Sequence, residues 1–323
     1  MPSSRYENPE ECYVLRFGIA LESFTPPHRR LTSTSLYQMA DTAESLGFDS
    51  VWVWDHILLG SRKVFPVLDS LTTLASIGAR TKRIKLGTGV LVLALRNPIV
   101  LAKVLSTIQY LTNGRLIIGS AAGWYEKEFE AVGLPYEKRG KIFEQRFKLV
   151  KSLLTEKDVQ YSSEGFRLEH ASMEPKSEIP IPLVIGGYSD SALARVGRLS
   201  DGWISYYYTP QGFADSFHKV AESARKNGRN PEALRRMNIV PLAIEDSFEE
   251  GDRIAKQFTS EYMDLPKNTG CTPNSAVRGT LDQCISQIKE FERAGIQDLI
   301  FIPCFYDLKY VRLAGEELVP KFS

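Results

Sequence analysis

Residues 84–119 read IKLGTGVLVLALRNPIVLAKVLSTIQYLTNGRLIIG, and this stretch decides the fold that the sequence predicts. The largely apolar segment from Ile84 to Leu93 predicts a strand. Pro98 stands near the start of the next apolar segment, which predicts a helix to Leu111. Asn113-Gly114 predicts a turn, and Leu116 to Gly119 predicts the following strand. The stretch therefore holds one complete strand–helix unit and the start of the next.

The same alternation of strands and helices continues along the chain on both sides of this stretch. The predicted strands are Phe17 to Leu21, Val51 to Trp54, Ile84 to Leu93, Leu116 to Gly119, Pro182 to Gly186, Gly202 to Ser205, Asn238 to Ile244 and Asp298 to Ile302. The predicted helices are Leu36 to Leu46, Asp69 to Ala79, Pro98 to Leu111, Lys138 to Leu154, Ser189 to Leu199, Pro210 to Lys226, Ser247 to Tyr262 and Thr280 to Ala294. Eight strand–helix units in a chain of 323 residues are typical of a TIM barrel.

A doubly wound sheet is the alternative α/β fold, and it places a glycine fingerprint after its first strand. Here residues 21–27 read LESFTPP, without that fingerprint. We therefore predict one α/β domain, a TIM (β/α)8 barrel over about residues 15–305, with a short N-terminal extension and a C-terminal tail. Insertions are expected after strands four and seven, at about Glu156 to Ile181 and Leu265 to Gly279, and long loops of this kind often bind or cover ligands.

Composition and charge exclude several classes of protein. Hydrophobic residues make up 43% and charged residues 24%, which is ordinary for a soluble globular protein. With 40 Lys+Arg against 39 Asp+Glu, the net charge of +1 provides no basic field for nucleic acid. The longest apolar run, Val90 to Leu95, is far shorter than the roughly 20 residues of a membrane span.

The four cysteines, Cys12, Cys271, Cys284 and Cys304, form no C-x-x-C pair and have no histidine pair beside them at zinc spacing. They are predicted to be free thiols of a reduced compartment. The first residues have no apolar core of the kind found in a signal peptide. We therefore expect a cytoplasmic protein.

In this barrel the functional site lies at the carboxyl ends of the strands, where Asp55 and His56 follow the second strand. A histidine there can bond a cofactor ring or act as acid or base near neutral pH. Alternatively, it only closes the strand end by donating to a backbone carbonyl. No further ligands accompany His56, so no metal site is predicted. The other histidines, His28, His170 and His218, are expected at the surface.

Gly186-Gly187 ends a strand and opens a helix, followed by Tyr188 and Ser189. The glycines would let backbone N–H groups approach a phosphate at the positive helix end, and the two hydroxyls can donate. A tight turn is the alternative role of the glycine pair.

Aromatic side chains are frequent at the predicted mouth, and some of them must belong to the core. Phe24, Trp124 and Tyr206 are candidates for a substrate pocket. An apolar pocket with a phosphate end would suit a flat, tricyclic cofactor. Glu126, Glu128 and Glu130 stand at every second position, and they are predicted to belong to a solvated face.

An ordered set of motifs extends this interpretation. The motifs are residues 84–98, 113–119 and 123–133, Arg139-Gly140, Gly186-Gly187, residues 201–203 and Gly279-Thr280. Together they resemble the luciferase-like monooxygenase superfamily, whose members are flavin- or deazaflavin-dependent oxidoreductases on a TIM barrel.

The resemblance implies a two-electron carrier lying across the carboxyl ends of the strands. It also implies a non-proline cis peptide at Gly89–Val90, which would bulge the third strand toward the isoalloxazine ring. Asp55-His56 looks like the pair that contacts the deazaflavin in the branch that uses coenzyme F420, and Ala122-Gly123 falls where that branch contacts the cofactor ring.

One position departs from part of this branch. In its sugar-phosphate dehydrogenases, a glutamate that protonates the cofactor follows the glycine after strand four, whereas this chain has Trp124. Tryptophan cannot supply the proton, so the resemblance here favours an apolar or aromatic substrate, with His56 as the residue that moves a proton.

Three functions follow from the sequence. The first is F420-dependent hydride transfer to or from a small organic molecule. The second is an FMN-dependent monooxygenase that uses O2 and flavin reduced by a separate reductase. The third is a non-catalytic barrel that binds a ligand. The resemblance also implies a homodimer formed through barrel helices.

Overall fold

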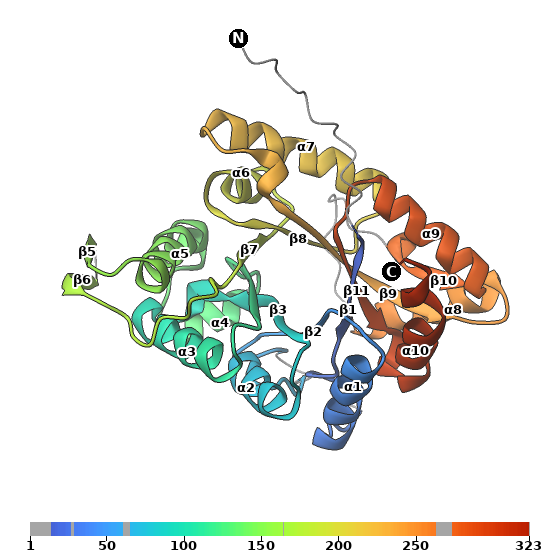
Figure 1. The fold of residues 1–323 in the computed structure, drawn as a ribbon. Helices are drawn as coiled ribbons and strands as arrows, with labels where there is room; N and C mark the ends of the chain where they lie inside the picture. Colours follow the sequence, from blue (N-terminus) through green and yellow to red (C-terminus); the bar gives the residue numbers. More distant parts are fainter. Residues whose placement is uncertain (1–13, 27–28, 61–64, 164, 263–272, 323) are drawn as a thin grey trace, which may run out of the picture.

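The computed structural model describes residues 14–26, 29–60, 65–163, 165–262 and 273–322. Within them, eight parallel strands form a closed barrel (Figure 1). In barrel order the strands are β1 (Arg16–Ala20), β2 (Ser50–Val53), β3 (Lys85–Val92), β4 (Leu116–Ala121), β7 (Leu183–Gly186), β8 (Gly202–Tyr206), β9 (Arg235–Ile244) and β11 (Asp298–Pro303). Pairing of β8 with β9 and of β11 with β1 closes the ring. The predicted TIM barrel is confirmed.

Helices surround the barrel and connect its strands (Figure 1). They are α1 (Ser33–Ser45), α2 (Ser70–Arg80), α3 (Pro98–Leu111), α4 (Glu126–Ala131), α5 (Arg139–Thr155), α6 (Asp190–Leu199), α7 (Pro210–Lys226), α8 (Phe248–Tyr262), α9 (Leu281–Arg293) and α10 (Leu308–Leu313). Every helix predicted from the apolar periodicity is present. The short helices α4 and α10 were not predicted, because six residues are too few to show a helical period.

Local side chains set several of these boundaries. Asn97 accepts hydrogen bonds from the N–H groups of Ile99 and Val100 at the start of α3, directly before Pro98. Gly47, with φ +81°, follows the end of α1 and adopts the left-handed conformation that glycine tolerates. Short-range signals of this kind explain why most predicted ends lie close to the observed ones.

Both predicted insertions contain strands that the sequence did not reveal. The first holds an antiparallel hairpin of β5 (Val159–Ser163) and β6 (Phe166–Ala171). The second contains residues 263–272, outside the described part of the chain, and then β10 (Val277–Gly279), which pairs with β9. Strand β9 also begins at Arg235, three residues before the predicted Asn238. The strand begins with two arginines, so its first residues do not show an apolar pattern. Arg235 nevertheless pairs with Gly202 of β8.

A buried ion cluster joins three strands at the amino end of the barrel. Asp298, at the start of β11, has a side chain only 3% exposed. Its carboxylate accepts two hydrogen bonds from Arg16 of β1, at 2.8 and 2.9 Å. It accepts two more from Arg235 of β9, at 2.7 and 2.6 Å. These bidentate pairs tie the first and last barrel strands together.

The structure also tests several smaller predictions. Cys284 and Cys304 are free and buried, whereas Cys12 and Cys271 lie outside the described residues. His170 and His218 are exposed, as predicted, and His28 lies outside the described residues.

In the part of the chain that the structure covers, no helix combines the length and apolar character needed to cross a membrane.

Candidate active site

A cavity of about 720 Å³ lies at the carboxyl ends of the barrel strands. All thirteen residues that the sequence suggested for the site line it. They are Phe24, Asp55, His56, Gly89, Val90, Ala122, Gly123, Trp124, Gly186, Gly187, Tyr188, Ser189 and Tyr206. These residues are far apart in the chain, but parallel strands in a closed barrel all end at one rim. The topology therefore brings them together.

Strand β3 changes its pairing where it reaches the cavity. The peptide bond between Gly89 and Val90 is cis, as the family resemblance implied. The register of β3 against β4 shifts between Thr88 and Leu91, so the strand departs from regular pairing at this point. Gly89 and Val90 consequently form part of the cavity wall.

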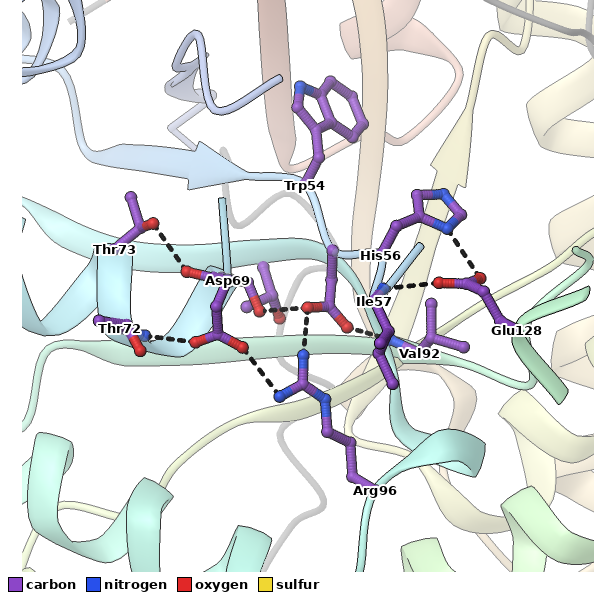
Figure 2. A network of polar contacts seen from close by, with 12 residues as sticks. Trp54, His56, Ile57, Asp69, Thr72, Thr73, Val92, Arg96 and Glu128 are labelled. Atoms are coloured by element: carbon purple, nitrogen blue, oxygen red, sulfur yellow. Dashed lines mark hydrogen bonds and ion pairs between the residues drawn. The ribbon is translucent and has the colours of Figure 1, made fainter. Parts of the chain in front are cut away.

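Asp55 connects several segments beside the cavity through hydrogen bonds of its carboxylate. Its Oδ2 accepts the backbone N–H of Val92 at 2.9 Å, two residues after the cis peptide. Its Oδ1 accepts hydrogen bonds from Ser70 at 2.8 Å and from Arg96 at 2.6 Å (Figure 2). Arg96 also bonds Asp69, the residue that caps α2. Asp55 thus holds the ends of β2 and β3 in place, and its contact with a cofactor stays a prediction.

His56 lies on the cavity wall with its side chain 15% exposed. Its Nδ1 is 2.9 Å from Oε2 of Glu128 (Figure 2). Its ring also makes an edge-on contact with the Trp124 indole. Among the described residues, Nε2 of His56 has no hydrogen-bond partner. The ring is therefore held at one nitrogen and open at the other.

The prediction that Glu128 belongs to a solvated face is wrong. Glu126 and Glu130 are exposed, but the Glu128 side chain is 0% exposed. Helix α4 turns Glu128 inward, where it also accepts the N–H groups of Ile57 and Leu58. The alternating pattern failed because this segment is a helix, in which neighbouring glutamates point in different directions.

An apolar wall occupies one side of the cavity. Phe24, which is 6% exposed, contacts Trp54 and Tyr262 edge-on. Trp54 in turn meets Tyr206. Trp124 is 47% exposed and lies at the opening beside His56. Such a wall favours contact with flat, apolar molecules.

Another part of the cavity lining, around Gly187, has the features that the sequence analysis linked to phosphate binding. Gly187 has φ +141°, and a Cβ at this residue would lie 2.6 Å from the Ala192 side chain. The Trp203 indole donates to the Gly187 carbonyl at 3.0 Å, which fixes this peptide at the start of α6. Ser189 caps the same helix by accepting the Ala192 N–H. Backbone N–H groups at a helix start attract phosphate.

Two arginines to which the sequence analysis gave no site role also line the cavity. Arg195 projects from α6 with a side chain 13% exposed; its Nε forms an ion pair with Glu144 at 3.8 Å but, among the described residues, no hydrogen bond. Burial lowers the pKa of Arg195, although the charge of Glu144 acts in the opposite direction. Arg139, at the start of α5, stacks on Tyr136. Glu137 also lines the cavity here and is exposed. The two cations give this part of the lining a chemistry that suits an anionic group.

The comparisons with known proteins agree with this geometry. Residues 15–298 match the family described as luciferase-like monooxygenase. The chain belongs to this family. The 5,10-methylenetetrahydromethanopterin reductase of Archaeoglobus fulgidus is 27% identical, over 87% of this chain and 93% of the relative. The F420-dependent glucose-6-phosphate dehydrogenase of Amycolatopsis mediterranei is 25% identical, over 88% of this chain and 93% of the relative.

Solved structures share the fold. An F420-dependent secondary alcohol dehydrogenase in complex with an F420–acetone adduct superposes with a TM-score of 0.78 at 18% identity, over 96% of this chain and 99% of the other. The oxygenating constituent of 3,6-diketocamphane monooxygenase from Pseudomonas putida, in complex with FMN, gives 0.75 at 16% identity, over 95% and 99%. The luciferase-like frame is therefore shared by proteins with either cofactor.

Within this luciferase-like barrel, sequence reasoning gave no site role to Arg96, Glu128, Arg139 or Arg195, although Arg96 and Arg139 belong to the motifs that carried the resemblance. One signal was available for Arg195. It lies four residues after Ser191 and three after Ala192, so all three share one face of α6, the helix whose start was predicted to bind phosphate. The remaining residues depend on contacts across the fold. Among the described residues, no group of three or more His, Cys, Asp and Glu side chains could hold a metal ion.

Proposed function

We propose that this chain is an oxidoreductase that transfers a hydride between coenzyme F420 and a small apolar or aromatic organic molecule. The observation that carries the proposal is a single cavity that joins an anion-binding end, an apolar wall and one open histidine nitrogen. The cofactor, when bound, would accept or donate the hydride. The names of relatives that use F420 support this choice over FMN.

The protein's own residues would bind, orient and move a proton. Gly187 and Arg195 would hold the phosphate, which leaves the ring of the cofactor to lie along the wall at Gly89–Val90. For a substrate alcohol, Nε2 of His56 would accept the hydroxyl proton as the carbon loses hydride, and it would return that proton in the reverse direction. Trp124 replaces an acid at the opening with an apolar surface, which favours a substrate without charge.

An FMN-dependent monooxygenase supplied by a separate reductase is the second candidate. The resemblance to a barrel solved with FMN favours it, since the same cavity features would accommodate either tricyclic ring.

A titration of the purified apo-protein with F420 and with FMN, followed by fluorescence, separates the two candidates. Tight binding of F420 alone supports the proposal, and alcohols, enones and imines would then be screened for turnover. Tight binding of FMN alone overturns it in favour of the monooxygenase, which would consume O2. Binding of neither cofactor would point to a non-catalytic barrel.

Replacing Gly187 by valine should weaken cofactor binding. The Cβ meets Ala192, and the larger side chain covers the N–H groups that would receive the phosphate. Loss of one or two charge-assisted hydrogen bonds predicts an increase in Kd of about 10- to 100-fold. Gly228→Val is the matched control, because Gly228 also has positive φ (+69°) but lies in open space. An unchanged Kd for Gly187→Val would remove this phosphate site.

We also propose that two chains associate through barrel helices. On α3, Val100, Tyr110 and Leu111 are 61%, 61% and 69% exposed, an apolar surface that association would cover. Light scattering should then give twice the mass of one chain, and the mass of a single chain would contradict the dimer.

A further inference from the structure

The buried carboxylate of Glu128 makes three specific polar contacts. Its Oε1 lies 2.6 Å from the backbone nitrogen of Ile57 and 3.1 Å from that of Leu58. Its Oε2 lies 2.9 Å from Nδ1 of His56 (Figure 2). One carboxylate therefore binds the backbone directly after His56 and the imidazole itself, which fixes both the loop and the ring.

The two backbone donors determine how the carboxylate is used. Oε1 is occupied by N–H groups, so Oε2 alone faces the imidazole. An ionised carboxylate can only accept hydrogen bonds, so Nδ1 of a neutral His56 must carry the proton. The other nitrogen, Nε2, then presents a lone pair.

The lone pair on Nε2 belongs to a ring that lines the cavity. His56 lines the cavity, and among the described residues nothing else bonds Nε2. Which nitrogen of a histidine is protonated is set by the hydrogen bond of the other nitrogen. A neutral His56 with Nε2–H would donate a hydrogen bond into the cavity instead of accepting a proton from it.

We propose that Glu128 is a positioning residue that holds neutral His56 in the Nδ1–H form, so that Nε2 is a proton acceptor in the cavity. The preferred form of the ring follows from the contacts of Glu128 alone. The catalytic use of that form rests on the proposed function.

Glu128→Gln reverses the arrangement with little change in shape. The amide oxygen can keep both backbone N–H groups, and the amide NH2 then faces His56 as a donor. Nδ1 must now accept, which moves the ring proton to Nε2. The opposite amide orientation would place NH2 against two backbone donors.

The experiment is 15N NMR of the apo-protein labelled at histidine, at a pH where the rings are neutral. Protonated and unprotonated ring nitrogens have well-separated 15N shifts, and a His56→Gln sample identifies the signals of His56. We expect Nδ1 protonated in the wild type and Nε2 protonated in Glu128→Gln. Glu130→Gln, on the exposed side of the same helix, should match the wild type.

Activity provides the second measurement. Exchange of the carboxylate behind a catalytic histidine for an amide is expected to lower kcat on the order of 10²- to 10⁴-fold, with KM less affected. Glu130→Gln should retain wild-type kcat.

Two spectra would overturn the inference: a wild-type ring protonated at Nε2, or a Glu128→Gln ring unchanged from the wild type. The wild-type spectrum decides by itself if the variant does not fold. Because the NMR sample contains no cofactor, failure of F420 to bind would overturn the proposed function without affecting this result.

Discussion

Replacing His56 by alanine is expected to lower kcat by about 10²- to 10⁴-fold, the contribution typical of a positioned acid or base. The His56 ring lies on the cavity wall and, among the described residues, nothing bonds its Nε2. Imidazole is the side chain most often used as an acid or base in catalysis. Stability should fall much less, by about 1 kcal/mol, because the ring is at the edge of the core and loses one hydrogen bond. Glu128 keeps its two backbone donors in this variant.

The measurement pairs steady-state turnover, on a substrate found in the alcohol, enone and imine screen, with thermal unfolding. His218→Ala is the control, since His218 is exposed on α7 and should change neither quantity. Unchanged turnover in His56→Ala would exclude the catalytic role. An equal loss of turnover and of folded protein would assign His56 a structural role instead.

Replacing Asp298 by asparagine is expected to lower the free energy of unfolding by about 3 kcal/mol at pH 7, because two arginines then lose a buried charge partner. Asp298 accepts four hydrogen bonds from Arg16 and Arg235, which belong to the strands on either side of it. Asp41→Asn is the matched control. Asp41 also pairs with an arginine, Arg80, at 2.6 Å, but both side chains are nearly half exposed, so its loss should cost less than about 1 kcal/mol.

The effect of Asp298 should depend on pH. Burial alone would raise the pKa of Asp298, but the hydrogen bonds and charges of Arg235 and Arg16 lower it below the ordinary value. A carboxyl group with a lowered folded-state pKa stabilises fully above its unfolded pKa of about 3.9 and loses this contribution as the pH falls through the folded value. The difference in the free energy of unfolding between the wild type and Asp298→Asn should therefore be largest at pH 7 and decrease below about pH 4. Urea unfolding of both proteins at pH 7 and below pH 4 measures this difference. A difference that increases in acid would contradict a stabilising role of the ionised Asp298.

Much of the fold could be predicted from the sequence, because its signals are local. Strands such as residues 116–119 are continuous apolar runs, as expected for strands buried on both faces of a parallel barrel. The helices carry a 3.6-residue apolar period and caps such as Asn97 within a few residues of their ends. Together with the family resemblance, which suggested Gly89, Val90, Ala122 and Gly123, this information indicated thirteen residues that all line one cavity, because the strands of a barrel end at the same rim.

The polar partnerships could not be predicted in this way. Glu128 and His56 are 72 positions apart, and Asp298 and Arg16 are 282 apart. Nothing in the neighbourhood of either carboxylate distinguishes it from an exposed one, and the alternating glutamates even suggested the wrong environment for Glu128.

The sequence by itself determined the barrel, its helices and the set of residues at its rim, since these depend on apolar periodicity and on short-range turns and caps. Only the tertiary structure decided which polar groups pair, which nitrogen of His56 is held and that two arginines lie on the same cavity lining as the Gly186-Gly187 turn. The physical reason is that burial of an apolar side chain is signalled by its own type and spacing. The burial and the hydrogen bonds of a charged side chain depend on partners that lie far away in the sequence and meet it only in the folded chain.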